Sequence, residues 1–211
     1  MAAVIEAVFG RNITLVYDAL DLKAIDRNKL REIIPETTPT VMDMPEMVVA
    51  VFPPSPWLIQ IGDRRIRINI AAEIEDLGDF PLWEYAIKCN ELAPANKTSL
   101  IAYGYNFDFG VRFQDTTAQN ALISKFVLNR SELEDMLQGV LTSYLPRMVF
   151  RTDEIQYDIV FDPINETHMK LHGNAHFQFD EIQLPSLEEL KSSYIAQYEH
   201  LRSIIENLLK D

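Results

Sequence analysis

Residues 99–114, SLIAYGYNFDFGVRFQ, decide the fold of this chain. The odd-numbered positions from 101 to 113 are all large and apolar, whereas the even-numbered positions between them are small or polar. Side chains alternate between the two faces of a strand, so the pattern predicts one long strand with an apolar face. A straight strand of this length would span about 53 Å at ~3.3 Å per residue, so we expect a bend at Gly104 or Gly110.

Other stretches show the same alternation. Residues 57–70 predict a hairpin, because isoleucines alternate on both sides of a turn at Gly62-Asp63. Arg65 and Arg67 fall on the opposite, polar face of this hairpin. Further strands are predicted at residues 154–162 and 167–179, and a hairpin or one bent strand at residues 4–17.

Signals for helix ends lie in the intervals between these strands. Asp79 is the predicted N-cap of a helix that runs through Leu92. Capping-box patterns begin at Thr116, Ser131 and Ser186. The last one opens a helix of about 25 residues. Its apolar positions recur every three or four residues, at Leu187, Leu190, Tyr194, Tyr198, Leu201, Ile205 and Leu208.

The order of these elements indicates an α+β fold. The strands come in hairpin-like pairs with one polar face, which favours a mostly antiparallel curved sheet covered by helices. A long C-terminal amphipathic helix completes the predicted architecture. We detect no internal repeat in the sequence, and we expect a single domain over residues 1–211, with a subdivision near residue 114 left open.

Charge and composition exclude several classes of function. The chain has 211 residues, with 19 Lys and Arg against 32 Asp and Glu, which gives a formal net charge of -13. Nucleic acid binding needs a basic surface, so we expect no nucleic acid partner. No apolar stretch approaches ~20 residues, so no membrane span is predicted. The lone cysteine, Cys89, fits a reducing compartment, and we expect a cytoplasmic protein.

The polar side of the long strand carries the candidate ligand-binding residues, Asn106, Asp108 and Arg112. They interrupt a face of otherwise small residues. The glycines beside them allow a ligand or a helix to approach the backbone closely. Core packing explains the aromatic face of this strand, but it does not explain why the opposite face carries these polar residues.

A row of three histidines, His168, His172 and His176, is the weak candidate for a metal site. On a helix this spacing would suit a metal ion, but the surrounding alternation predicts a strand. Residues i and i+4 of a strand lie about 13 Å apart, too far to share one zinc ion. His172 and His176 would each need a ligand from a neighbouring strand, so we expect a solvent-facing row and no metal.

No catalytic motif is recognisable. The sequence contains no GxGxxG, GxxxxGK[ST], GxSxG, HExxH or CxxC pattern. Asp108, Asp158 and Asp162 lie on polar strand faces, where two of them would need to be neighbours to act as an acid/base pair. We therefore assign no catalytic residue and no cofactor.

Four short motifs resemble those of a sporadically distributed, functionally uncharacterised bacterial protein family. They are Ile5-Glu6-Ala7, Gln60-Ile61-Gly62-Asp63, Trp83 at the start of a helix, and Tyr105-Asn106. The similar part covers about residues 4–113. Asn106 follows Tyr105 directly, whereas that family has one residue between them. The resemblance implies no activity.

These observations favour a non-enzymatic domain that binds a protein partner or its own copy. The alternative is a small-molecule binding protein or enzyme with an apolar cavity between the curved sheet and the last helix. That cavity would be lined by the aromatic row Tyr103, Tyr105, Phe107, Phe109 and Phe113. A metal-dependent hydrolase is a third hypothesis, and it requires a carboxylate or a second histidine beside His172 or His176.

Overall fold

A single antiparallel sheet organises the computed structural model, which describes residues 3–35, 37–73, 77–94, 98–153, 155–178 and 183–210. Within these residues nine strands follow the order β2-β3-β4-β5-β1-β6-β9-β8-β7. Every neighbouring pair is antiparallel. The predicted α+β class and antiparallel sheet are confirmed.

The strands are β1 (Ala3–Tyr17), β2 (Thr40–Asp43), β3 (Met47–Val51), β4 (Trp57–Gly62), β5 (Arg65–Ile70), β6 (Leu100–Phe113), β7 (Arg147–Thr152), β8 (Ile155–Pro163) and β9 (His168–Gln178). The α-helices are α1 (Arg27–Glu32), α2 (Leu82–Asn90), α3 (Ala118–Phe126), α4 (Arg130–Leu137) and α5 (Leu187–Leu209). Two 3-10 helices, η1 (Leu22–Ala24) and η2 (Leu77–Asp79), complete the set.

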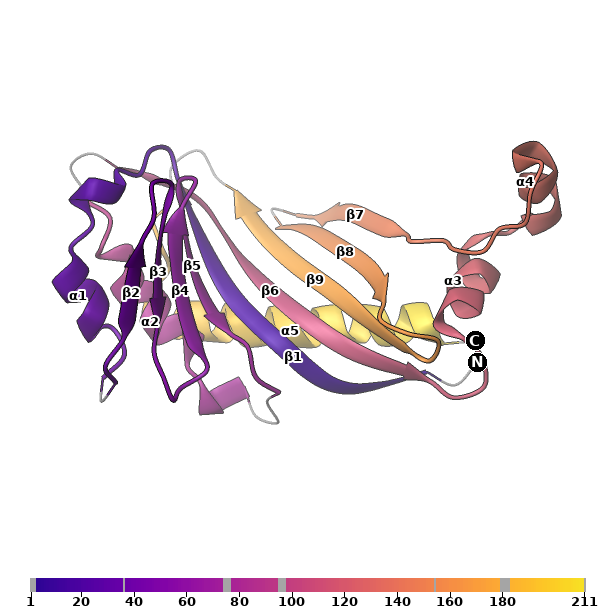
Figure 1. Ribbon diagram of the computed structural model, residues 1–211, viewed down its shortest axis with the longest axis horizontal. Coiled ribbons are helices and arrows are strands. Elements are labelled where there is room, and N and C mark those ends of the chain that lie inside the picture. Colours follow the sequence, from indigo (N-terminus) through magenta and orange to yellow (C-terminus); the bar gives the residue numbers. More distant parts are fainter. Residues whose placement is uncertain are drawn as a thin grey trace.

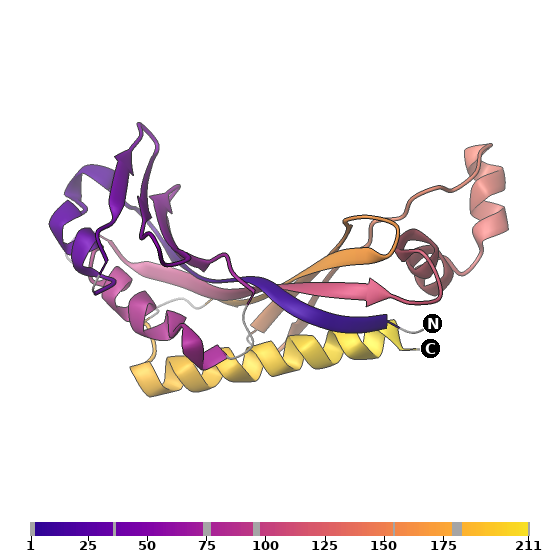
Figure 2. The same ribbon diagram turned by 60° about the horizontal axis from the view of Figure 1, so that its bottom comes forward.

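The two faces of the sheet differ in what covers them. Figure 1 shows α5 running along the sheet beneath its central strands. In Figure 2, α5 and α2 lie on one face, and the opposite face of the central strands is open between the two raised ends of the molecule. The predicted C-terminal helix is thus confirmed as the cover of the apolar face.

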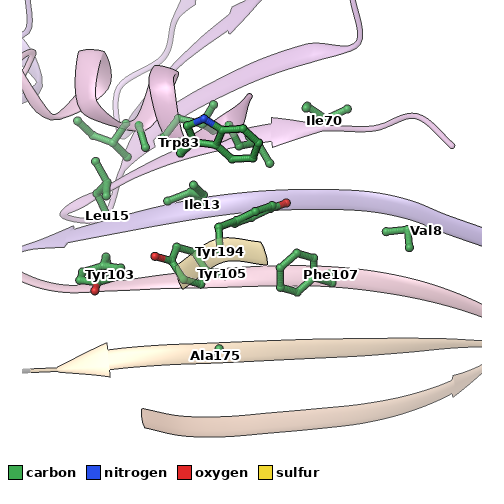
Figure 3. Close-up of a cluster of buried hydrophobic side chains, with 14 of the residues drawn as sticks. Val8, Ile13, Leu15, Ile70, Trp83, Tyr103, Tyr105, Phe107, Ala175 and Tyr194 are labelled. Carbon is green, nitrogen blue, oxygen red and sulfur yellow. The ribbon is translucent and has the colours of Figure 1, made fainter. Parts of the chain in front are cut away.

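The apolar side of β6 forms the centre of the core. The Tyr105 and Phe107 rings pack on Tyr194 of α5, with centroids 5.3 and 5.0 Å apart (Figure 3). A Cβ at Gly173 of β9 would lie 3.3 Å from the side chain of Leu201, so this glycine lets α5 approach the sheet closely. The aromatic row predicted from the sequence therefore fills the core.

The first strand decides between the two interpretations of residues 4–17. β1 is continuous, so the hairpin interpretation is wrong and the bent strand holds. Its pairing with β6 shifts register between Ile5 and Ala7 and again between Val8 and Gly10, which places extra residues on β1. The two shifts skip Glu6 and Phe9 of β1, so these bulges lie on β1, next to Gly110 of β6. A third shift, between Val16 and Tyr17, skips Ile101 of β6.

Some helix starts differ from the predictions. The capping box at Ser186 and Glu189 is present. In α3 the N-cap is Thr117 rather than Thr116, and in α4 it is Asn129 rather than Ser131, because these side chains reach the free N–H groups of the first turn. No side chain caps α2, whose N-cap position is Pro81 rather than Asp79.

The topology contains an internal repeat, although no repeat is evident in the sequence. A central strand is followed by helical segments, a run of strands and a helix, first from β1 through α2 and then from β6 through α5. The run has three strands in the second unit and four in the first, where β2 is the additional strand at the edge of the sheet. In the sheet the two units read β3-β4-β5-β1 and β7-β8-β9-β6, and they meet at the antiparallel pair of β1 and β6. This arrangement relates the two units by an approximate two-fold axis.

The repeat has a short sequence counterpart at the junction of the units. Residues 9–15 read FGRNITL, and residues 103–109 read YGYNFDF. Asn12 and Asn106, which occupy the same position in these two stretches, pair directly across the junction. Only the glycine and the asparagine are identical in the two stretches, and three other positions are aromatic or apolar in both, so the similarity is hard to recognise from the sequence alone.

Candidate functional site

A row of asparagines crosses the open face of the sheet. In register, Asn69 of β5, Asn12 of β1, Asn106 of β6 and Asn174 of β9 lie side by side. Asn174 donates from Nδ2 to Oδ1 of Asn106 at 2.8 Å, and Asn106 donates to Oδ1 of Asn12 at 2.7 Å. The Thr14 hydroxyl donates to the same Asn12 oxygen at 2.9 Å. These bonds fix the amide groups as a polar strip across both units.

The open face is hollowed beside this strip. The hollow has a volume of about 380 Å³, and Thr14, Gly104 and His176 lie next to one another in its floor. Because Gly104 has no side chain, the space between its two neighbours stays open. The remaining lining residues are Val16, Arg65, Arg67, Asn106, Arg147, Asp158, His172 and Asn174.

The hollow is positively charged although the chain as a whole is acidic. Asp158 is the single carboxylate of the lining, and it binds Arg147, whose Nε lies 2.9 Å from Oδ1. Arg67 reaches Thr14 at 3.4 Å and forms no ion pair with any residue the structure describes. Burial, and then the charge of Arg65, lower the pKa of His176. The site therefore favours anionic or hydrogen-bonding groups.

Asp108 and His172 form a pair at the edge of this hollow. The Nδ1 atom of His172 lies 2.7 Å from Oδ1 of Asp108. A carboxylate only accepts hydrogen bonds, so Nδ1 of His172 is the donor in this pair. Thr14 supplies a hydroxyl to the lining of the hollow, and this hydroxyl donates to Asn12 at 2.9 Å.

The predicted ligand residues separate into two places. Asn106 lies in the hollow, and Asp108 binds a lining histidine. Arg112 lies six residues after Asn106 on β6, outside the hollow, and it pairs with Glu6 of β1. The structure thus brings together two of the three residues predicted on this strand.

The histidine row lies on the open face, as the alternation predicts. His172 and His176 line the hollow, whereas His168 approaches Glu6 at 3.7 Å, beside Arg112. Nowhere in the described ranges do three histidine, cysteine, aspartate or glutamate side chains gather as a metal ion would require. The metal-dependent hydrolase hypothesis requires a carboxylate or a second histidine beside His172 or His176, and Asp108 is a carboxylate in this position beside His172.

Most of the positive charge of this site is not predictable from the sequence. The alternation puts Arg65 and Arg67 on the polar face of their hairpin, but it does not indicate which strands lie beside that hairpin. Arg147 comes from β7, which pairs with β8 so that its side chain reaches Asp158. Alternation identifies the face of a residue, but it does not identify which strands are neighbours.

A second candidate surface is the arm, which we define as residues 127–145. It consists of α4 and its flanking segments, and Figures 1 and 2 show α4 standing away from the sheet. None of its residues is buried. Five large apolar side chains are exposed along it: Leu128, Met136, Leu137, Val140 and Leu145.

The arm is held by its own hydrogen bonds. Arg130 donates to Glu134 at 2.8 Å and to the Leu141 carbonyl at 3.1 Å. The same Glu134 carboxylate accepts from the Leu141 backbone at 2.9 Å. The hydrogen bond from Arg130, and then that from Leu141, lower the pKa of Glu134. The arm therefore presents its apolar side chains from an ordered scaffold.

Comparison with known proteins adds no assignment. The sequence matches no model of a known protein family and no curated protein sequence. The resemblance of residues 4–113 to the uncharacterised bacterial family thus stays a prediction. Among the helices in the described part of the chain, none has the length and apolar character needed to span a membrane.

Proposed function

We propose that this chain is a non-enzymatic protein-binding domain whose arm is the contact surface. The observation that carries this proposal is the exposure of five large apolar side chains on residues 127–145, a segment that buries none of its own residues. Single exposed apolar residues are normal on a protein surface, whereas five of them on one projecting segment suggest an interaction surface. Leu128 is 99 % exposed and Met136 is 76 % exposed.

The cost of this exposure supports the proposal. Burying apolar surface stabilises a folded protein by roughly 25 cal/mol per Å², so apolar side chains that stay in water on the arm do not contribute this stabilisation. In the first unit, the corresponding interval holds α1, which buries Leu30. The second unit packs α3 in the same way and then extends α4 outwards. A partner that covers α4 would recover the missing burial.

The charges on the arm indicate the chemistry of that partner. Arg130 is its single cation, against Glu132, Glu134 and Asp135. A partner surface with an apolar centre and a basic rim would complement it. A second copy of this chain, which also carries a net charge of -13, would be repelled at low salt. The proposal is therefore a different protein partner.

Site-specific photocrosslinking in the native cell tests this assignment. A photoreactive phenylalanine analogue replaces Met136 on the arm or, as the matched control, the exposed Glu188 at the start of α5. We expect one discrete crosslinked protein from position 136 and none from position 188. Mass spectrometry then identifies the crosslinked protein.

The same experiment can contradict the proposal. No crosslink from position 136, or equal crosslinking from both positions, would remove the arm as the contact surface. A crosslink between two copies of this chain, with a dimer in light scattering, would replace the different partner by self-association. In a further variant the photoreactive analogue replaces Val140 on the arm. Met136→Glu should then abolish the specific crosslink from position 140 while leaving the folded chain intact, because Met136 is 76 % exposed and has no role in the core.

Small-molecule binding is the second candidate function. The aromatic row proposed as a cavity lining is packed in the core, with Tyr105, Phe107 and Phe109 fully buried. Beside α5, however, lies a hollow of about 680 Å³, within the range of ligand sites. Native mass spectrometry of the purified protein tests this candidate, and a bound small molecule would support it.

A further inference from the structure

Arg67 of β5 presents unused donors to the hollow on the open face. Its Nε donates to the Thr14 hydroxyl over a long 3.4 Å, which holds the inner end of the guanidinium above β1. In the described part of the chain, its Nη1 and Nη2 groups form no hydrogen bond and no ion pair. The side chain is exposed, so a ligand in the hollow can reach both groups.

Arg65 borders the same space. It lies two residues before Arg67 on β5, so both side chains project from one face, about 7 Å apart at ~3.4 Å per residue. Its side chain is 51 % exposed, and its ion pair with Asp63 is 4.0 Å long, beyond hydrogen-bond distance. Asp63 itself is 83 % exposed, so water screens this pair. Two accessible guanidinium groups thus lie side by side at the hollow.

His176 faces these arginines across a gap without a side chain. Four neighbouring strands contribute, in order, Arg67, Thr14, Gly104 and His176. With strands about 4.8 Å apart, the α-carbons of the first and the last lie about 14 Å apart, and the long arginine side chain closes part of this span. Burial, and then the charge of Arg65, lower the pKa of His176, so the arginine acts across the hollow. The neutral imidazole still supplies one N–H donor.

The positive charge of this space is not balanced within the described chain. The hollow is lined by three arginines and a single carboxylate, Asp158, which already binds Arg147 through two nitrogen atoms. The nearby carboxylate of Asp108 is held by His172 at 2.7 Å. The two arginines of β5 are thus left without a carboxylate at hydrogen-bond distance in the described ranges. In a chain with a net charge of -13, such a local excess of positive charge favours a bound anion.

A second hollow adjoins the first along β5. It has a volume of about 620 Å³, within the range of ligand sites, and Arg65 and Arg67 line both hollows. Met47 of β3 lies two strands from Arg65 in the register and lines this second hollow with a side chain that is 38 % exposed. A ligand whose anionic group lies at the arginines can therefore extend an organic group towards Met47.

We propose that the open face binds a small organic oxyanion, a phosphate monoester or a carboxylate, whose anionic group lies between Arg65, Arg67 and His176. The paired donors of a guanidinium match two oxygens of either anion. This site lies above the central strands, whereas the arm forms part of one raised end of the molecule (Figure 2). The proposal therefore does not rest on the proposed function, and either can fail without the other.

Titration of the full chain with anions tests the proposal. The probes are inorganic phosphate, phenyl phosphate and benzoate. Sodium chloride at equal ionic strength is the reference, because a general charge effect responds to any salt. Isothermal titration calorimetry measures the affinity, and the NMR signals of the His172 and His176 rings report whether the anion lies in the hollow.

The variants are Arg67→Gln, Arg65→Gln and, as matched control, Arg64→Gln. The control removes the same charge from an exposed neighbouring position that lines neither hollow. We expect the wild type and Arg64→Gln to bind phenyl phosphate or benzoate with a shift of the His176 signal. Arg67→Gln and Arg65→Gln should each weaken the affinity at least about tenfold, because each loses charged hydrogen bonds to the anion. All three arginines are exposed, so the variants should fold like the wild type.

The choice of probes distinguishes the two anions. Binding of phenyl phosphate without benzoate identifies a phosphoryl ligand, and the reverse identifies a carboxylate. A wild type that binds no probe more tightly than chloride would overturn the proposal, as would equal affinities in the wild type and Arg67→Gln. An equal loss in Arg64→Gln and Arg67→Gln would also overturn it, because a general field would then explain the binding. If a variant does not fold, the His176 signal of the wild type decides: it must shift with a probe and not with chloride.

Discussion

Asn106 donates a hydrogen bond from Nδ2 to Oδ1 of Asn12 over 2.7 Å, across the strand pair where the two repeated units meet. Each asparagine lies on the central strand of its own unit. The bond therefore joins equivalent positions of the repeat, and it lies at the centre of the polar strip on the open face.

Removal of this bond should destabilise the junction. Asn106→Ala takes a donor from Asn12 and an acceptor from Asn174, so we expect a loss of about 1 kcal/mol in the free energy of unfolding. Urea denaturation measures it. Gln60→Ala is the matched control, because Gln60 accepts a single weak bond at 3.5 Å. An equal loss in both variants would contradict the role of the strip.

The ring of Phe9 occupies the space that a side chain at position 110 would need. A Cβ at Gly110 would lie 2.2 Å from Cε2 of Phe9, so Gly110→Ala must displace this half-exposed ring. We expect a loss of about 1 kcal/mol, in the range of overpacking. In a Phe9→Ala background the same substitution should cost almost nothing. Additive losses in the double variant would show that the ring does not impose the glycine.

His176 should make the stability dependent on pH. Burial and the charge of Arg65 lower its pKa below the 6.5 of an ordinary histidine. The unfolded chain then binds the proton first, so stability falls as the pH drops from about 6.5 towards the lower pKa of the folded state. Above that window the contribution is constant. His176→Gln should flatten this part of the profile in denaturation experiments.

Arg65 offers a direct check of the cause. Arg65→Gln removes a positive charge near the imidazole, so the pKa of His176 should rise towards 6.5. NMR titration of the histidine ring measures the change. Arg31→Gln, on α1, should leave the titration curve unchanged. A pKa of His176 that is unaffected by Arg65→Gln would leave burial as its sole cause.

The capping box of α5 should be worth a measurable part of the stability. Ser186 accepts from the Glu189 backbone, and the Glu189 side chain accepts from the Ser186 backbone at 3.0 Å. Ser186→Ala should cost about 1 kcal/mol. Ser192→Ala, at an exposed position of the same helix, should cost nothing. Equal melting temperatures for the two variants would count against the cap.

Much of the fold follows from local patterns. The alternation at residues 57–70 predicts β4 and β5, and Asp63 and Arg64 at their turn have positive φ, as a tight hairpin requires. The stripe of the last helix is right for Leu190, Tyr194, Leu201 and Ile205, but Leu209 is buried in place of Leu208. These elements were predictable because each is decided by residues close in the sequence.

The candidate site was predictable only in part, because it depends on which strands are neighbours. Asp108 and His172 are 64 residues apart and meet through the pairing of β6 with β9. Residues 4–17 predict either a hairpin or one bent strand, and no local pattern marks Arg11 as buried. Residues 40–43 show no strand pattern in the sequence. They form β2, since the edge of β3 supplies hydrogen bonds that their own sequence does not demand.

The way α5 is placed couples the two repeated units in unfolding. This helix belongs to the second unit, yet its Tyr194 packs against Trp83 of α2 in the first unit, with ring centroids 5.7 Å apart. Neither unit can therefore lose its structure without exposing core side chains of the other. The most protected amides in β1 and β6 should accordingly exchange with the same free energy of global unfolding. The two units are then repeated in topology, but they unfold together as one cooperative unit.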